Sequence, residues 1–355
     1  METDREPDTY AVAVNNFGIT SANCIATSAL HKSADLFENL YPAASHDIKE
    51  QTYVDDELVA AEDKEKLIIK TKQMDEISSH ANMHNKGWVY SGDNASGEVQ
   101  IGAVAEDERV LGMLWNPSSD NFYFKVKLKL KIRGDQGIVD VIIYTVDELN
   151  EHAVNIILTR RIVLSNVSKI FDPPGFLCPV TLLAKLLLRE SWKDQTIGWD
   201  DPLPQDQVHE WLTFFKSLLT LNKIQIPRSL WPEGEVVGSP LLIIFSDGSI
   251  SAYGVAAYVR WKVRGGGYWT RLIMSKSKIN PKHVQSVPRS ELCGAVSGNR
   301  VGNFLVKNTT FSFSKVYHIV DSSTVLGYVH KESGNFEPFE GIKISEIQST
   351  RSHRR

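Results

Sequence analysis

The segment Leu241–Ser249, which reads LLIIFSDGS, is the stretch around which the rest of the chain can be interpreted. Its apolar residues include β-branched and aromatic types, and such a short run predicts a buried strand. Asp247 comes at the end of this run and is followed by Gly248 and Ser249, which favour turns. The carboxylate is therefore expected at the rim of a sheet, where a metal ion or a substrate can reach it.

Five further elements follow this strand. Two more strands are predicted at Ala252–Trp261 and Tyr268–Met274, a helix begins near Pro288, and Val316–Asp321 forms a last strand before a helix opens at Ser322–Thr324. We expect Glu291 in the first turn of the helix that begins near Pro288. This order describes a three-stranded meander, a helix and a fourth strand.

The strand hairpin system, the helix and the last strand each supply one acid: Asp247, Glu291 and Asp321. A lone Asp at a strand end is most often a turn or cap residue. Three acids on converging elements instead suit a hard divalent cation, Mg²⁺ or Mn²⁺.

Charge is distributed unevenly along the chain, although the formal net charge is only −4. Residues 236–355 contain 16 Lys and Arg against 7 Asp and Glu, whereas residues 1–235 contain 23 against 36. A basic surface around an acidic trio predicts a phosphodiester substrate, and a merely solubilising charged face is the alternative. The residues expected to contact nucleic acid here are Arg260, Lys262, Arg264, Arg271, Lys276, Lys278 and Arg289.

The compartment is predicted to be intracellular, cytoplasmic or nuclear. The 3 cysteines are scattered, which favours a reducing environment. The longest apolar stretch, near Leu177–Leu188, is interrupted by Lys185 and is too short to cross a bilayer, so no membrane partner is expected.

Upstream, Gln51–Val59 predicts a tight hairpin with Asp55 and Asp56 at its tip. Other elements expected from periodicity and turn signals are helices at Cys24–Leu40, Glu62–His80, Val180–Trp192 and Gln205–Leu221, strands at Trp88–Tyr90, Val110–Trp115, Phe122–Ile132 and Val139–Thr145, and a linker at Pro232–Glu235.

The tetrad Tyr53–Asp56 resembles the catalytic hairpin of reverse transcriptases, in which carboxylates hold Mg²⁺. Phe17–Ser21, with Gly18, resembles the polymerase segment that contacts template and nucleotide, and Val110–Trp115 resembles the strand that grips the primer. The resemblance implies catalytic and metal-binding roles for Asp55 and Asp56 and a nucleic-acid contact at Gly18.

Downstream, four segments resemble the BEL/Pao class of LTR retrotransposon polyproteins: Ser168–Val180, Trp199–Leu203, Pro288–Leu292 and Val320–Leu326. The resemblance extends from about Tyr10 to Gln348. It implies an α+β / α/β multidomain protein with a partial polymerase palm in 1–163, a helical connection and linker in 164–235, and a ribonuclease H-like mixed sheet with helices in 236–355.

This resemblance also implies a function. Asp247, Glu291 and Asp321 would hold metal ions that hydrolyse RNA in an RNA–DNA hybrid. The implied partners are the hybrid or another nucleic acid and the rest of the polyprotein.

Some features depart from these families. The first polymerase Asp would precede the chain and the fourth ribonuclease H acid would follow it, so we expect an inactive polymerase part and a ribonuclease H-like domain truncated at its C-terminus. Gly294, Gly298 and Gly302 either permit close packing of their helix against the sheet or mark sequence decay.

A non-catalytic remnant that binds nucleic acid therefore stays an alternative. An aspartic peptidase is less consistent with the sequence, because Asp247 precedes Gly-Ser and Asp321 precedes Ser-Ser rather than Thr-Gly or Ser-Gly.

Overall fold

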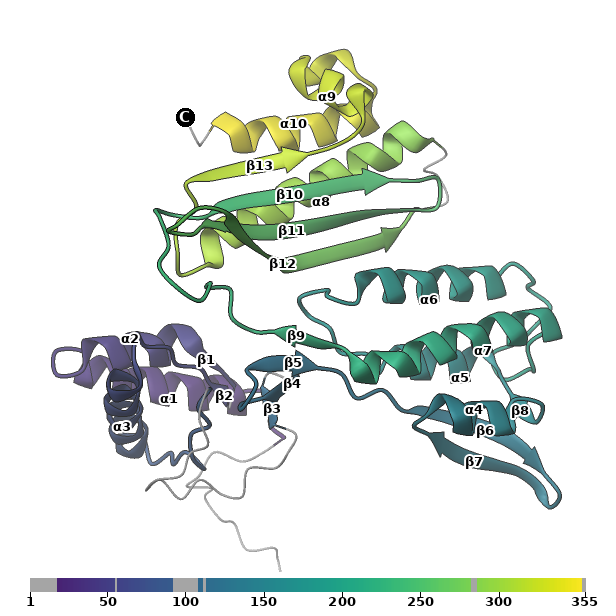
Figure 1. Ribbon diagram of the computed structural model, residues 1–355, viewed down its shortest axis with the longest axis horizontal. Coiled ribbons are helices and arrows are strands. Elements are labelled where there is room, and N and C mark those ends of the chain that lie inside the picture. Colours follow the sequence, from purple (N-terminus) through teal and green to yellow (C-terminus); the bar gives the residue numbers. More distant parts are fainter. Residues whose placement is uncertain (1–17, 55, 92–107, 111–112, 282–285, 353–355) are drawn as a thin grey trace, which may run out of the picture. The chain divides into compact units, whose positions relative to one another are not determined.

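The computed structural model describes residues 18–54, 56–91, 108–110, 113–281 and 286–352 (Figure 1). The chain forms two compact units, Met1–Asp120 and Asn121–Arg355, which are treated separately below. The predicted domain boundaries at 163/164 and 235/236 both lie inside the second unit and stay predictions. No helix in the described ranges is long and apolar enough to span a bilayer.

The first unit contains three packed helices and two short strand pairs. Its elements are α1 (Ala22–Phe37), α2 (Pro42–Gln51), β1 (Thr52–Tyr53), β2 (Asp56–Glu57), α3 (Lys64–His80), β3 (Glu108–Val110) and β4 (Met113–Asn116). Leu30, Ile48, Met74 and Ile77 form the buried core between the helices. The hairpin predicted at Gln51–Val59 is present as the antiparallel pair β1–β2.

Two predictions for this unit were wrong. The segment Trp88–Tyr90 is not a strand, because the Trp88 indole donates a hydrogen bond to Asp75 on α3 (2.9 Å) and its ring packs on the helical core. The stretch Val110–Trp115 is not one strand, since β3 and β4 pair with each other in antiparallel register.

The second unit begins with a helical block around a small sheet. Its elements are β5 (Asn121–Tyr123), β6 (Leu128–Gly134), β7 (Gly137–Ile143), α4 (Val146–His152), β8 (Ile156–Ile157), α5 (Arg160–Val167), α6 (Cys178–Ser191), α7 (Gln205–Leu219), η1 (Thr220–Lys223) and β9 (Gln225–Pro227).

The strand predicted at Phe122–Ile132 is two strands, β5 and β6, that pair with different partners. In β6 the apolar residues Leu128, Leu130 and Ile132 are buried, and the basic residues between them face solvent. These residues share a core with Trp211 and Phe215 of α7, so the alternation reflects a half-buried strand rather than a wholly exposed one.

A turn at Asp172–Gly175 joins the helical block to the edge of the large sheet. The Asp172 carboxylate accepts hydrogen bonds from the backbone N–H groups of Gly175, Phe176 and Leu177. Burial raises the pKa of Asp172, and these three hydrogen bonds offset part of that rise. The turn then pairs with the strand that carries Ser275, whose N–H donates to the Pro174 carbonyl (2.8 Å) and whose hydroxyl donates to the Gly175 carbonyl.

The large sheet has the strand order β12-β11-β10-β13. The elements from the sheet to the C-terminus are β10 (Leu241–Gly248), β11 (Ala252–Lys262), β12 (Tyr268–Ile279), α8 (Val287–Asn308), β13 (Lys315–Ile319), α9 (Ser323–His330), η2 (Ser333–Asn335) and α10 (Pro338–Ser352). Strands β10, β11 and β12 form an antiparallel meander, and β13 pairs in parallel with β10. Helix α8 lies across one face (Figure 1) and buries Val301 and Leu305 against Leu242 and Ile244.

The predicted fold class, α+β / α/β with a mixed sheet and helices, is confirmed. One detail was wrong: α8 begins at Val287, so Glu291 is its fifth residue and lies beyond the first turn. The reason is that Ser286 caps the helix, accepting a hydrogen bond from the Arg289 N–H, with Pro288 inside the first turn.

Candidate metal centre

Two of the three predicted acids lie at the ends of neighbouring parallel strands, Asp247 within the last two residues of β10 and Asp321 just after β13. In the β10–β13 ladder Phe245 is opposite Ile319. Asp247 and Asp321 each come two residues later on their own chains. Since side chains repeat every two residues along extended backbone, the equal offset brings both carboxylates to the same edge of the sheet.

The third acid, Glu291, is brought to that edge by the close approach of α8 to β10. A Cβ atom at Gly248 would lie 2.5 Å from the Glu291 nitrogen, and a Cβ at Gly294 would lie 2.8 Å from the Asp247 carbonyl oxygen. Only residues without a Cβ allow this separation. A Cβ at Gly302 would lie 2.7 Å from Ile244 Cδ1, whereas a Cβ at Gly298 would make an ordinary contact of 3.4 Å with Ile244 Cγ2. The structure therefore supports the close-packing interpretation for Gly294 and Gly302.

A buried polar cluster fixes the start of α8. The Asn280 amide donates to the Ser249 carbonyl (2.8 Å) and to the Ser290 hydroxyl (2.9 Å), and the Ser290 hydroxyl also reaches the Ala252 carbonyl (3.3 Å). Directly after Asp321, the Ser322 side chain caps α9 by accepting a hydrogen bond from the Val325 N–H (3.2 Å). These bonds hold the backbone on both sides of the acids.

Ligand atoms from Asp247, Glu291 and Asp321 all lie within 4.8 Å of one another. The two aspartates are exposed and Glu291 is partly buried. Among the described residues the only hydrogen bond to these carboxylates is the one that the Gly248 N–H donates to Asp247 Oδ1 (2.6 Å). Three carboxylates this close repel one another, and their oxygens are the ligands that Mg²⁺ and Mn²⁺ prefer, so the donor set fits a divalent cation.

The structure describes only one residue of the predicted acidic pair Asp55 and Asp56. Asp56 lies in β2 opposite Tyr53, and Asp55 lies outside the described residues. Within the described ranges, the trio of Asp247, Glu291 and Asp321 is the single group of three side chains close enough to share a metal ion. Val54 has a φ of 60°, which is costly for a β-branched residue, and this strain marks the tip of the hairpin.

The residues predicted to contact nucleic acid make different local contacts. Arg260 stacks over Tyr268 (4.0 Å to the ring centroid) and Arg271 over Trp269 (4.6 Å). Lys262 is exposed at the end of β11.

Arg264 forms an ion pair with Glu235, and Arg289 forms one with Glu340 (2.6 Å). Lys276 and Lys278 line a pocket beside α8. Gly18 is exposed, with a φ of +89°. Nucleic-acid contacts at all of these residues stay predictions.

Positioning residues were missed by the sequence interpretation. Glu340, on α10, joins the start of α8 through Arg289, and the two residues are 51 positions apart, so no local pattern relates them. Asn280 and Ser290 are buried polar residues that look like ordinary loop and cap residues in the sequence. Only the tertiary structure reveals their roles.

The helical glycines give a matched pair of mutations. Gly294→Ala is expected to lower the free energy of unfolding by roughly 1–3 kcal/mol, because its Cβ would meet Asp247 backbone that cannot move aside. Gly298→Ala, whose Cβ would first meet Ile244 Cγ2 at 3.4 Å, should be neutral or stabilising by up to about 1 kcal/mol.

Thermal unfolding of both variants checks this difference, with Gly327→Ala on α9, where nothing lies within 4 Å, as the control for helix propensity. Equal changes at Gly294 and Gly298 would show that α8 does not approach β10 as closely as described.

The family described as the Pao retrotransposon-like RNaseH-like domain matches residues 159–322. This match is a similarity of that segment, which makes up less than half of the chain. The Pao-like segment runs from the N-cap of α5 to the N-cap of α9 and contains all three acids of the metal centre. The predicted resemblance to BEL/Pao retroelement polyproteins is confirmed.

Solved structures add only a distant likeness. A foamy viral protease-reverse transcriptase dRH in complex with double-stranded DNA is 12% identical with a TM-score of 0.44, covering 93% of this chain and 47% of that one. A second foamy viral protease-reverse transcriptase in complex with double-stranded DNA is 12% identical with a TM-score of 0.40, covering 88% of this chain and 53% of that one. The chain thus spans about half the length of these structures. No curated protein matches it.

Proposed function

We propose that residues 236–355 hydrolyse the RNA strand of RNA–DNA hybrids with the help of divalent ions held by Asp247, Glu291 and Asp321. The observation that carries this proposal is the convergence of the three carboxylates, within 4.8 Å of one another, in a segment that matches an RNaseH-like family. Fold-level similarity alone would not be sufficient, because one fold can serve many activities.

Each acid has a distinct structural role in the proposed site. Asp247 is held by the Gly248 N–H and approached by α8, Glu291 is fixed by the buried start of that helix, and Asp321 lies just before the N-terminus of α9. Bound Mg²⁺ or Mn²⁺ would supply Lewis-acid stabilisation of the phosphate and would activate a water molecule. The protein's own contribution is to keep three anionic oxygens together before the ions arrive.

For residues 1–163 we propose a relationship to the palm of reverse transcriptases, with the β1–β2 hairpin carrying Asp55 and Asp56. Its support is the sequence of the hairpin, together with the antiparallel pairing of β1 with β2. The proposed setting for this chain is intracellular, in the cytoplasm or nucleus, as part of a polyprotein.

Binding to an RNA–DNA hybrid is expected to weaken steeply as salt rises, because Lys and Arg displace counterions from phosphates. Reversing the charges of Arg260, Lys262 and Arg264 should reduce both the affinity and the salt slope, by about one unit per lost phosphate contact. The measurement is fluorescence anisotropy of a labelled hybrid at several salt concentrations without divalent ions. Binding that is independent of salt, or unchanged in the triple variant, would argue against these contacts.

The test of hydrolysis is gel-resolved cleavage of a hybrid labelled on the RNA strand, with Mg²⁺, with Mn²⁺ and with a chelator. Ion-dependent cleavage of the RNA strand alone is the expected result. Hybrid binding without cleavage under any ion condition would instead favour the non-catalytic alternative, a decayed remnant that only binds nucleic acid.

A further inference from the structure

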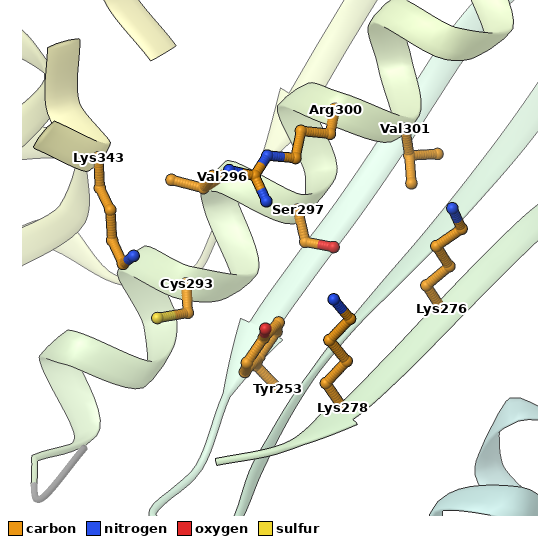
Figure 2. A pocket seen from close by; sticks show the side chains of 9 residues that line it. All are labelled: Tyr253, Lys276, Lys278, Cys293, Val296, Ser297, Arg300, Val301 and Lys343. Carbon is orange, nitrogen blue, oxygen red and sulfur yellow. The ribbon is translucent and has the colours of Figure 1, made fainter. Parts of the chain in front are cut away.

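A small basic pocket lies between helices and sheet in the second unit. It has a volume of about 160 Å³, well above the roughly 10–15 Å³ that one water molecule needs. Figure 2 shows its lining side chains, which come from β11, β12, α8 and α10. Four of them are cations: Lys276, Lys278, Arg300 and Lys343.

The sheet register and the helix period explain why these residues meet. Tyr253 is opposite Lys278 in the β11–β12 ladder, and Lys276 lies two residues away on the same face. On α8, Ser297 and Arg300 are three residues apart and therefore share one side of the helix. In Figure 2 both lysines extend from the strand toward this side of the helix.

The positive charge of the pocket is poorly compensated. Arg300 is paired with Glu346 through two hydrogen bonds of 2.6 and 2.8 Å. Lys276, Lys278 and Lys343 form no ion pair with an acid among the described residues, although Lys343 is near enough to Glu346 to lower the pKa of that carboxyl and lies 4.4 Å from the Phe339 ring centroid. Glu346 is therefore the carboxylate shared by two of the four cations, and the remaining positive charge favours an anion in the space between them.

The pocket also offers neutral donors. The hydroxyl groups of Tyr253 and Ser297 line it and make no hydrogen bond to any described residue. Ammonium, guanidinium and hydroxyl donors around a small cavity are a set that suits phosphate oxygens.

This pocket is separate from the metal centre. Residues two positions apart on a helix point about 200° away from each other, so Glu291 and Cys293 face opposite sides of α8. Arg300 and Ser297 lie on the Cys293 side. A group bound here therefore lies across the helix from the three acids.

We propose that this pocket binds a phosphate group, held by Lys276, Lys278, Arg300 and Lys343 with help from the Tyr253 and Ser297 hydroxyls. The phosphate is either a free anion or part of a nucleic-acid backbone, and the same donors recognise both. The inference does not depend on the proposed hydrolysis, because it concerns residues outside the metal centre.

The test uses the full chain and two ligands. Inorganic phosphate is titrated by calorimetry, and a labelled RNA–DNA hybrid is titrated by anisotropy without divalent ions. Lys278→Gln and Lys343→Gln are each expected to weaken binding about fivefold, since one charge pair near 4 Å contributes about 1 kcal/mol in water. Lys315→Gln, an exposed lysine at the start of β13, is the control for losing one charge.

The two ligands separate the two sources. Weaker phosphate binding in the pocket variants shows that a free anion suffices, and Asp247→Asn should then leave phosphate binding unchanged. If phosphate does not bind but the hybrid binds about fivefold more weakly to the pocket variants than to Lys315→Gln, the ligand is a backbone phosphate. If the pocket variants match Lys315→Gln with both ligands, the proposal is wrong.

Discussion

Asp247→Asn is expected to reduce cleavage of the RNA strand by at least about 100-fold, because it removes one of three anionic oxygens that would hold the divalent ions. The side chain is exposed and its one hydrogen bond comes from the adjacent Gly248 N–H, so the amide can replace it without a loss of packing. Less repulsion among the acids should leave the ion-free protein at least as stable as before. The measurement is the initial rate of hybrid cleavage with Mg²⁺ or Mn²⁺.

Asp135→Asn is the matched control, since Asp135 is an exposed acid in the turn between β6 and β7. It should cleave at the wild-type rate. Cleavage that survives Asp247→Asn and Asp321→Asn alike would come from another site or from a contaminant, and the assignment of the metal centre would fail.

Gly175→Ala is expected to lower the free energy of unfolding of the second unit by about 2–5 kcal/mol. Part of this is the left-handed backbone, with φ at +82°, which costs an L-residue about 1–2 kcal/mol. The rest, about 1–3 kcal/mol, comes from overpacking, because the new Cβ would overlap the Ser275 carbonyl oxygen. Chemical unfolding of the full chain, following the transition of residues 121–355, measures the loss.

Gly234→Ala separates the two causes. Gly234 also has a left-handed backbone, with φ at +100°, but nothing lies within 4 Å of its Cβ position. Gly234→Ala should therefore lower the free energy of unfolding only by the conformational cost, about 1–2 kcal/mol. If both variants lose the same free energy of unfolding, the Asp172–Gly175 turn does not pack tightly against β12.

The acids could be predicted from sequence because each is marked by local patterns. An apolar run that ends in Asp-Gly-Ser predicts a strand that stops, and the same argument applies before Asp321. The sequence did not decide whether α8 packs closely on β10. The need for glycine at position 294 follows only from its contact with Asp247, 47 residues earlier. The helix start was misplaced because Ser286 was not recognised as the N-cap.

Clustering of basic residues in the sequence does not reveal which face of the sheet or which partner each one has. Arg260 and Lys276 are close in sequence, but Lys276 is opposite Val255, which lies five residues from Arg260 on β11, so the two cations are on different faces of the sheet. Lys276 therefore faces the pocket beside α8, and Arg260 stacks on Tyr268. The sequence did not indicate that Arg289 forms an ion pair with Glu340, because the two residues are far apart in the chain, and its predicted contact with nucleic acid stays a prediction.

The most direct test of the central claim is the change in unfolding temperature that Mn²⁺ or Mg²⁺ causes. It is measured for the full chain and for Asp247→Asn, Glu291→Gln, Asp321→Asn and Asp135→Asn. If the three acids together bind the ion, the wild type and Asp135→Asn will be stabilised in a concentration-dependent way, and the three site variants will not be. An equal shift in all five proteins, or no shift in the wild type, would contradict the proposed metal centre.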